Sequence, residues 1–384
     1  MQFELTEEQL AIQKAARDFA VQECLPGVIE RDDKQQFARD QIIKLGELGF
    51  MGMMVDPAYG GSGMDTISYV LAMEEISKVD ASVSVCMSVN NSLVCWGLDK
   101  YGSEDQKKEY LTHLAAGKKD GELYIGAFLL SEPEAGSDAT SQHTVAEDKG
   151  DYYILNGTKN WITNGKNASV YLVMAQTDAS QGSRGIDVFI VEQNTAGITV
   201  GAKENKMGIR GSDTHSIMFQ DVKVPKKNRI GEHGFGFTFA MKTLEGGRIG
   251  IASQALGIAS GAYERALAYA KQRKAFGKEI AQHQAIQFKL ADMATRIEAA
   301  RLLCMRAAWE KDKGMNYAVS SSMAKVYASE TAMWVTTEAV QIHGGYGYVK
   351  EYHVERLMRD AKITQIYEGT SEVQRIVIGR NILK

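Results

Sequence analysis

The chain has 384 residues, a net charge of -4, 44% hydrophobic residues and 24% charged residues, which is typical of a globular protein with two or three domains, each burying its own core. The acidic balance argues against nucleic acid as the main partner, because phosphate binding requires a basic excess. The four cysteines form no CxxC pair and the seven histidines no HxxxH spacing, so we expect reduced thiols and no metal site.

The first section of the chain is predicted to be helical throughout. Residues 6–9 have the spacing of a capping box, and Ile12, Ala16 and Phe19 then recur on one helical face. Further helical patterns cover 40–49, 67–78, 81–101 and 104–116.

The N-terminus has neither the apolar core of a signal peptide nor the arginine-rich character of a transit peptide. We therefore expect a cytoplasmic protein, or one of the mitochondrial matrix if a transit peptide has been removed. Residues 81–98 are uncharged over 18 positions. Their serines and the pair Asn90-Asn91 are too polar for a membrane span, and we expect none.

From about residue 123 the pattern changes to short β-rich runs. Clusters of small and polar residues, including Asn156-Gly157 and Asn164-Gly165, separate the runs and favour antiparallel strands joined by turns. We predict a small β barrel or sandwich that closes at Val224-Pro225. The runs are 124–130, 152–155, 170–174, 186–191 and 216–219.

The last section is predicted to be a bundle of long helices over 237–273, 282–313, 316–343 and 352–362. Gly250, Gly257 and Gly261 predict close packing of the first of these helices, since glycine weakens a helix interior. The predicted fold is therefore multidomain α+β. It has an N-terminal helical domain (1–122), a middle β domain (123–230) and a C-terminal four-helix bundle (231–384).

Near the C-terminus, Tyr367-Glu368-Gly369-Thr370 places a carboxylate on a turn in which glycine lets a ligand approach the backbone. Glu368 could act as a base there, although the same residues could form a plain surface turn before the last helix. His343 is expected to pack rather than react, because no nucleophile lies near it in the sequence.

Two loops of the middle section are rich in small and polar residues. Residues 131–138 follow one β run, and residues 161–165 end another. Their backbone N–H groups and hydroxyls suit a polar ring or a phosphate, and Trp161 offers a flat apolar face. Both loops could equally be hairpin turns.

Six segments of the chain occur in a recognisable order. They are Leu130-Ser131-Glu132-Pro133-x-Ala135-Gly136-Ser137-Asp138, Trp161-Ile162-Thr163-Asn164-Gly165, Gly247-Arg248-Ile249, Arg273-x-x-Phe276-Gly277-Lys278, Gln341-x-x-Gly344-Gly345 and Tyr367-Glu368-Gly369-Thr370. Together they resemble the acyl-CoA dehydrogenase family over essentially the whole chain, and within it the short-chain, butyryl-CoA type. The resemblance implies a helix, sheet and helix-bundle fold, noncovalent FAD, a homotetramer, and electron transfer to an electron-transfer flavoprotein in fatty acid β-oxidation.

The resemblance also assigns roles to individual residues. The flavin ring would lie against Leu130, Ser131, Gly136, Ser137, Trp161 and Thr163. The FAD of a neighbouring subunit would be contacted by Arg273, Phe276, Gln284, Gln341, Gly344 and Gly345. Thr370 and Glu372 would contact FAD beside the turn. The acyl-CoA thioester would lie against Ser137, Glu245, Arg248, Tyr367 and Gly369, although the family more often has Asp at the position of Glu245.

The reaction implied is removal of an α-proton by Glu368 together with hydride transfer from the β-carbon to the flavin, which gives a trans-2-enoyl-CoA. Some relatives carry the base immediately before the arginine matching Arg248, but this chain has Gly247 there. Residues 81–98 contain no cation, which disfavours a glutaryl-type substrate.

Several alternatives have the same motifs or part of them. A branched-chain acyl-CoA dehydrogenase and an acyl-CoA oxidase would share the fold. A noncatalytic flavin-binding assembly factor and a purely structural helical protein belong to other classes. The intact Glu368 and the FAD motifs argue against the first of these, and the middle β section with its loops argues against the second.

Overall fold

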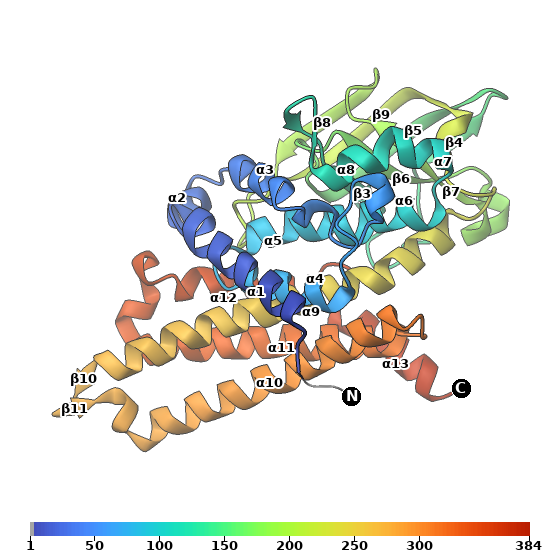
Figure 1. The fold of residues 1–384 in the computed structure, drawn as a ribbon. Coiled ribbons are helices and arrows are strands. Elements are labelled where there is room, and N and C mark those ends of the chain that lie inside the picture. Colours follow the sequence, from blue (N-terminus) through green and yellow to red (C-terminus); the bar gives the residue numbers. More distant parts are fainter. Residues whose placement is uncertain (1–3) are drawn as a thin grey trace.

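The protein, described here over residues 4–384 of a computed structural model, confirms the expected order of helices, sheet and helices (Figure 1). The sheet lies at one end of the molecule and the long C-terminal helices at the other. The N-terminal helices lie between them and along the bundle (Figure 1).

The N-terminal part is a set of short helices with side-chain caps at several of their starts. Thr6 and Gln9 form the predicted capping box, and Asp65 and Asp80 cap two later helices. The helices are α1 (Glu7–Phe19), α2 (Val28–Asp33), α3 (Arg39–Glu47), α4 (Thr66–Ser77), α5 (Ala81–Ser88), α6 (Trp96–Tyr101), α7 (Glu104–Gln106) and α8 (Thr112–Ala116), followed by the hairpin β1 (Lys118–Lys119) and β2 (Glu122–Leu123).

A π-helical turn at Val89–Cys95 joins α5 and α6 into one continuous helical stretch, Ala81–Tyr101. This stretch is long and apolar enough to cross a membrane, but 94% of its most apolar window is buried inside the protein. Asn90 donates to the Met51 and Leu114 carbonyls and accepts from the Gly126 N–H at 2.9 Å. The polar residues that argued against a membrane span thus connect this core helix to its surroundings.

The middle part is one curled seven-stranded sheet (Figure 1). Its strand order is β3-β6-β4-β5-β9-β8, with β7 paired to the other side of β6. The predicted antiparallel pairing is found for β4–β5, β5–β9, β6–β7 and β8–β9, whereas the β3–β6 pair is parallel. The strands are β3 (Gly126–Leu129), β4 (Val145–Asp148), β5 (Tyr152–Thr163), β6 (Val170–Gln176), β7 (Ile186–Glu192), β8 (Ile198–Lys203) and β9 (Thr214–Pro225).

Asn156-Gly157 was expected to separate two strands, and this prediction was wrong. The pair lies inside β5, where the register with β9 shifts between Leu155 and Gly157. Gly157 has φ +148° and a Cβ at this position would overlap with Thr144. A β-bulge therefore lets the strand continue where the sequence pattern indicated a turn.

The C-terminal part is built on three long helices that pack along one another. The second of these helices buries a stripe made of Leu290, Met293, Ile297 and Cys304. The helices are α9 (Gly236–Gln272), α10 (Gln284–Asp312) and α11 (Ala318–His343), followed by α12 (Val354–Ile363) and α13 (Ser371–Ile382). The hairpin β10 (Lys274–Ala275) and β11 (Lys278–Glu279) joins α9 to α10.

The two helical parts share one hydrophobic core, which includes Met73 and Met87 from the first and Leu256 and Ala328 from the last. A continuous core therefore joins the two helical parts. The glycines of α9 explain the sharing, because a Cβ at Gly257 would overlap with the Glu74 carbonyl of α4. The prediction of close packing at these glycines is confirmed.

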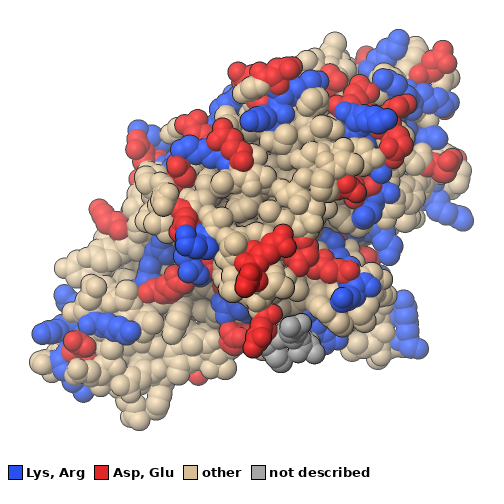
Figure 2. All heavy atoms as spheres, viewed as in Figure 1, with Lys and Arg blue, Asp and Glu red and all other residues tan. Residues whose placement is uncertain are grey.

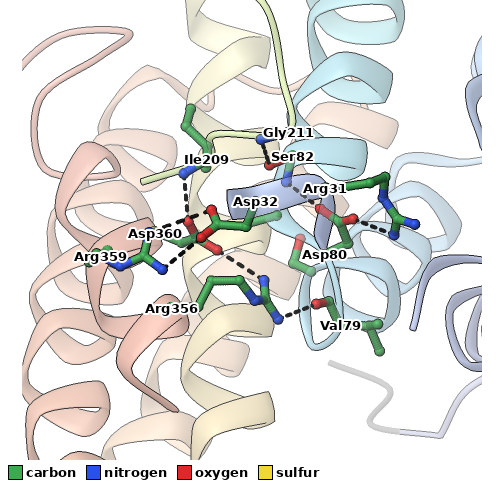
Figure 3. A network of polar contacts seen from close by, with 12 residues as sticks. Arg31, Asp32, Val79, Asp80, Ser82, Ile209, Gly211, Arg356, Arg359 and Asp360 are labelled. Atoms are coloured by element: carbon green, nitrogen blue, oxygen red, sulfur yellow. Dashed lines mark hydrogen bonds and ion pairs between the residues drawn. The ribbon is translucent and has the colours of Figure 1, made fainter. Parts of the chain in front are cut away.

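Asp360 of α12 connects all three parts of the chain (Figure 3). Its carboxylate accepts from the Ile209 N–H of the middle part at 2.5 Å and from Arg356 at 3.1 Å. Arg356 in turn donates to the Val79 carbonyl of the N-terminal part at 2.7 Å. Since Asp360 and Arg356 are both almost fully buried, each depends on the other for charge compensation.

A second ion pair extends this network. Arg359 of α12 donates to Asp32 of α2 at 2.7 Å, and the Gly211 N–H donates to Ser82 of α5 at 3.1 Å (Figure 3). The segment that leads into the Glu368 turn is thus fixed to both other parts of the protein.

The surface carries charges of both signs. Figure 2 shows Lys and Arg interspersed with Asp and Glu over most of this face, with wide uncharged areas over the helical bundle. Exposed apolar side chains on the C-terminal part include Phe276, Phe288, Tyr348 and Leu383.

We predict that Asp360→Ala lowers the free energy of unfolding by about 3 to 5 kcal/mol, because Arg356 is left buried without its carboxylate. The matched control is Asp148→Ala, which removes an ion pair with Lys226 whose side chains are 49% and 47% exposed and should cost less than about 1 kcal/mol. Urea unfolding of both variants measures the difference. Equal, small losses would contradict the role given to the network.

Candidate active site

Glu368 lies on a tight turn between α12 and α13, in a conformation that non-glycine residues rarely adopt. Its φ is +50° and that of Gly369 is +92°, so two consecutive residues are left-handed. Thr370 caps α13, its hydroxyl accepting from the Val373 N–H. A strained turn of this kind persists only where its surroundings hold it.

Side chains from other elements hold the turn in place. Gln374 of α13 donates to the carbonyls of Glu368 and Gly369 at 3.2 and 3.0 Å. Tyr367 donates its hydroxyl to the side-chain carbonyl of Gln254, which is fully buried on α9. The turn is therefore fixed against both α9 and α13.

The carboxylate of Glu368 lies against α9. A Cβ at Gly247 would overlap with Oε2 of Glu368 and contact Leu93 at 2.8 Å. Oε2 is buried and has no hydrogen-bond partner among residues 4–384. Gly247 thus provides the space into which the carboxylate projects.

Burial raises the pKa of Glu368 to about 7, while the positive charges of Lys325 and Arg248 oppose this shift. A carboxylic acid with such a pKa is half ionised near neutral pH. Its ionised form is a much stronger base than a free carboxylate. The position and the pKa both suit a general base.

Arg248 and Glu245 lie beside this turn on α9. Arg248 is buried, its Nη1 is 3.4 Å from the Ser322 hydroxyl, and its Nε has no partner among residues 4–384. Glu245 is half-buried and pairs with Lys242 at 3.6 Å. The residues that the resemblance assigns to the thioester therefore lie together, with Ser137 on a separate loop of the middle part.

One turn beyond Gly247, hydroxyl groups close the space beside α9. A Cβ at Gly250 would meet the Ser88 hydroxyl at 2.5 Å and the Tyr69 hydroxyl at 2.7 Å. Tyr69 also donates to Ser88 at 3.0 Å. Three helical residues rise by roughly 4.5 Å, so the carboxylate and this hydroxyl pair lie about one turn apart along α9.

The residues that the resemblance assigns to the flavin ring lie in two adjacent places in the middle part, the loop after β3 and the last residues of β5. Trp161 is 60% exposed with φ +60°, and the Asn160 N–H donates to the Ser131 carbonyl at 2.9 Å. A Cβ at Gly136 would meet nothing within 4 Å. An exposed indole beside open backbone and hydroxyl groups fits a flat polar ring. The members of the set are Leu130, Ser131, Gly136, Ser137, Trp161 and Thr163.

A fully buried lysine of β5 bonds to the loop that follows β3. Lys159 of β5 donates to Glu132 at 2.8 Å, to Gln142 at 3.0 Å and to the Leu130 carbonyl at 3.1 Å. Glu132 also accepts from the His143 N–H at 2.6 Å. The loop that follows β3 is therefore bonded to the strand that carries Trp161.

The remaining predicted residues lie far from the turn. Arg273 follows the end of α9, roughly 40 Å along the helix from Gly247. Its guanidinium lies 5.5 Å from the Tyr346 ring centre. His343 packs on Tyr269 at 4.3 Å, as predicted. This distal group comprises Arg273, Phe276, Gln284, Gln341, Gly344 and Gly345. Glu372, by contrast, is exposed at the start of α13 beside the turn.

Sequence reasoning missed four residues that shape the site: Lys325, Gln374, Gln254 and Lys159. The signal for Lys325 was a single lysine among small residues on a buried face of α11, where Ala324, Ala328 and Ser329 are fully buried. The other three have no signal in a single sequence, because their partners lie on other elements.

Family models of known proteins match the chain in three places. They are the N-terminal, middle and C-terminal domains of acyl-CoA dehydrogenase, over residues 6–118, 127–222 and 234–383. The chain belongs to the acyl-CoA dehydrogenase family. One relative is the short-chain specific acyl-CoA dehydrogenase of Clostridium acetobutylicum. It is 47% identical to this chain over 384 residues, which cover 100% of both chains.

Solved structures of similar acyl-CoA dehydrogenase fold include butyryl-CoA dehydrogenase from Megasphaera elsdenii, at 50% identity and a TM-score of 0.97 over 100% of both chains. A chain from a structural study of the electron transferring flavoprotein of Acidaminococcus fermentans has 50% identity and a TM-score of 0.98, again over 100% of both chains. The FAD complex of PigA has 29% identity and a TM-score of 0.94, covering 100% of this chain and 99% of that one.

We predict that Gly247→Ala slows flavin reduction by the thioester about 100-fold or more, because the new methyl group displaces the Glu368 carboxylate. The matched control is Gly246→Ala, whose Cβ would meet its nearest atom, Nζ of Lys311, at 3.7 Å. Both substitutions replace a helical glycine with alanine and therefore raise the helix propensity by the same amount. A similar rate in the two variants, measured by stopped-flow absorbance, would contradict the position assigned to the carboxylate.

Glu368→Gln should stabilise the fold in a pH-dependent way. Because the pKa of Glu368 rises from 4.5 to about 7 on folding, the stability of the parent protein falls as pH increases through this window, by up to roughly 3 kcal/mol. Glutamine avoids this loss. Thermal unfolding of the FAD-saturated proteins should therefore show a larger gain at about pH 8 than at about pH 5, and an equal gain at both would contradict the raised pKa.

Proposed function

We propose that this protein catalyses the FAD-dependent α,β-dehydrogenation of a short-chain acyl-CoA, with butyryl-CoA as the model substrate and a trans-2-enoyl-CoA as the product. The single observation that carries the proposal is the buried, unpaired Oε2 of the Glu368 carboxylate, held on a left-handed turn beside Lys325 and Arg248. Membership of the acyl-CoA dehydrogenase family and the similarity to short-chain relatives support the choice of substrate.

Glu368 acts as the base that takes the α-proton. The negative charge that develops on the thioester oxygen needs hydrogen-bond donors already in place, each worth a few kcal/mol in a dry site. The backbone N–H of Glu368 makes no hydrogen bond within residues 4–384, so it is available as one such donor. Arg248 adds a buried positive charge close to the same point.

FAD, when bound, supplies the acceptor for the hydride that leaves the β-carbon. The open loops with Ser131, Gly136 and Trp161 hold its flavin ring, and Ser137 and Thr163 offer hydroxyls beside it. Thr370 and Glu372 meet the same cofactor at the turn. Leu130 belongs to the same core cluster as Leu93, which lines the space at Gly247, so this arrangement supports a flavin close to the base.

The distal group on the hairpin and at the end of α11 serves the FAD of a second copy of the chain. Arg273 lies roughly 40 Å along α9 from Gly247, and this separation supports a role for the hairpin residues toward a cofactor bound to another copy of the chain. Arginine suits the diphosphate through paired, charge-assisted hydrogen bonds. We propose a homotetramer, in which the exposed Phe276 and Phe288 become buried.

A short acyl chain is favoured by the space beside α9. Ser88 and Tyr69 close it one helical turn from the carboxylate, and Gln254 fills the next turn. A longer chain would have to displace hydroxyl groups that are hydrogen-bonded to each other.

The division into residues 1–122, 123–230 and 231–384 remains our prediction for the domain boundaries.

The electron acceptor is an electron-transfer flavoprotein, and the expected location is the cytoplasm or the mitochondrial matrix. The structure from the study of the Acidaminococcus fermentans flavoprotein, with a TM-score of 0.98 to this chain, supports this partner. An oxidase would instead pass electrons to oxygen, and air reoxidation of the reduced protein distinguishes the two.

The test is anaerobic mixing of the purified protein with butyryl-, hexanoyl-, octanoyl- and isovaleryl-CoA while the flavin absorbance is followed. We expect the fastest bleaching with butyryl-CoA, and a loss of about 1,000-fold or more in Glu368→Gln with FAD still bound. Fastest bleaching by isovaleryl-CoA would assign a branched substrate. Normal bleaching by Glu368→Gln would contradict the base, and a protein that binds no flavin would favour the noncatalytic alternative.

A further inference from the structure

Lys325 of α11 is the charged residue most closely associated with the Glu368 turn. Its side chain is completely buried, and its ammonium donates to the Gly369 carbonyl at 2.6 Å. This is the one hydrogen bond that the ammonium makes among residues 4–384. A buried ammonium with no carboxylate bonded to it is costly to the fold, which points to a role beyond packing.

The bond falls within the left-handed turn. Gly369 has φ +92° and follows Glu368 at φ +50°, and its carbonyl also accepts from Gln374 at 3.0 Å. Two donors from two different helices therefore hold one carbonyl. Since the carbonyl of Gly369 is one peptide unit from Glu368, fixing it fixes where the Glu368 side chain leaves the backbone.

We infer that Lys325 is a positioning residue for the reaction, one that both anchors the Glu368–Gly369 turn and places a positive charge beside the carboxylate of the base. This inference rests on the proposed role of Glu368. It adds that the turn is incomplete without a cation from α11, and that this cation decides at which pH the carboxylate is ionised.

Electrostatics agree with the geometry. Lys325 lowers the pKa of Glu368 more than Arg248 does, against the larger effect of burial, which raises it. Burial in turn lowers the pKa of Lys325 to about 8, while Glu368 opposes that shift. The titratable and charged groups near this carboxylate are Lys325 on α11, Arg248 on α9, Tyr69 on α4, Tyr367 on the turn and Glu372 on α13.

Two neutral variants separate the charge of Lys325 from its hydrogen bond. Lys325→Gln keeps a donor for the Gly369 carbonyl and removes the charge, whereas Lys325→Met removes both. The measurement is the rate of anaerobic flavin bleaching by butyryl-CoA as a function of pH, on protein whose FAD content and thermal unfolding have been checked.

The expected result is a shift of the acid limb of the pH profile to higher pH, by about 1 to 2 units, in both neutral variants. The direction follows because a carboxylate without its neighbouring cation is harder to ionise, and the base must be ionised to act. The plateau rate at high pH should fall further in Lys325→Met than in Lys325→Gln, since only methionine loses the bond to the turn. The acid limb of Lys325→Arg should stay at the pH of the parent protein, because arginine keeps the positive charge.

Lys206→Gln is the matched control. The ammonium of Lys206 also donates to a loop carbonyl, that of Ser212 at 2.9 Å, but it lies in the middle part of the chain, away from Glu368. Its pH profile should overlay that of the parent protein. A shift of equal size in this variant would show that the effect is not specific to Lys325.

An unmoved acid limb in Lys325→Gln with FAD bound overturns the inference, and Lys325→Gln decides the question if Lys325→Met fails to fold. The two proposals fail differently. If Glu368→Gln bleaches normally, the base itself is wrong. If Glu368→Gln is inactive while both neutral Lys325 variants keep the parent limb, only the role of Lys325 is wrong.

Discussion

The burial of one carboxylate without a hydrogen-bond partner is the constraint on which the rest of the structure depends. An isolated ionised group in a dry environment is strongly disfavoured, yet Oε2 of Glu368 is buried and unpaired. Two buried cations, Lys325 and Arg248, compensate it from α11 and α9 without neutralising it by direct contact. The result is a base whose pKa is close to neutral pH. The backbone turn that carries it is held by side chains from other helices.

The architecture supplies what this turn requires. The glycines of α9 allow the N-terminal helices to approach α9 closely. The two helical parts therefore share one core and enclose the space at Gly247. Asp360 bonds α12 to the middle and N-terminal parts just before the turn. The middle sheet contributes the loop after β3 and the end of β5 rather than catalytic side chains. Lys159 bonds these two segments to each other. Rigid surroundings thus position a strained segment, which is how catalytic geometry is generally maintained.

Local patterns predicted most of this fold. Helical periodicity located α9 to α12 within a few residues, and glycine in α9 correctly indicated close packing. Asn156-Gly157 misled because a bulge and a turn use the same residues, and only pairing with β9 distinguishes them. The position of Glu368 could be proposed from its motif, whereas its contact with Gly247 joins residues more than a hundred positions apart. Lys325 was missed for the same reason, because a buried cation gains its meaning only from the carbonyl that it meets.

The central claim is that Glu368 removes a proton from the α-carbon of a thioester. Acetyl-CoA isolates this step, because it has α-protons but no β-carbon from which a hydride could leave. The most direct measurement is deuterium incorporation into the acetyl group of acetyl-CoA, followed by mass spectrometry with the FAD-loaded protein in deuterium oxide. The account predicts incorporation above the protein-free rate with the parent protein and none above it with Glu368→Gln. Equal incorporation by both proteins would contradict it.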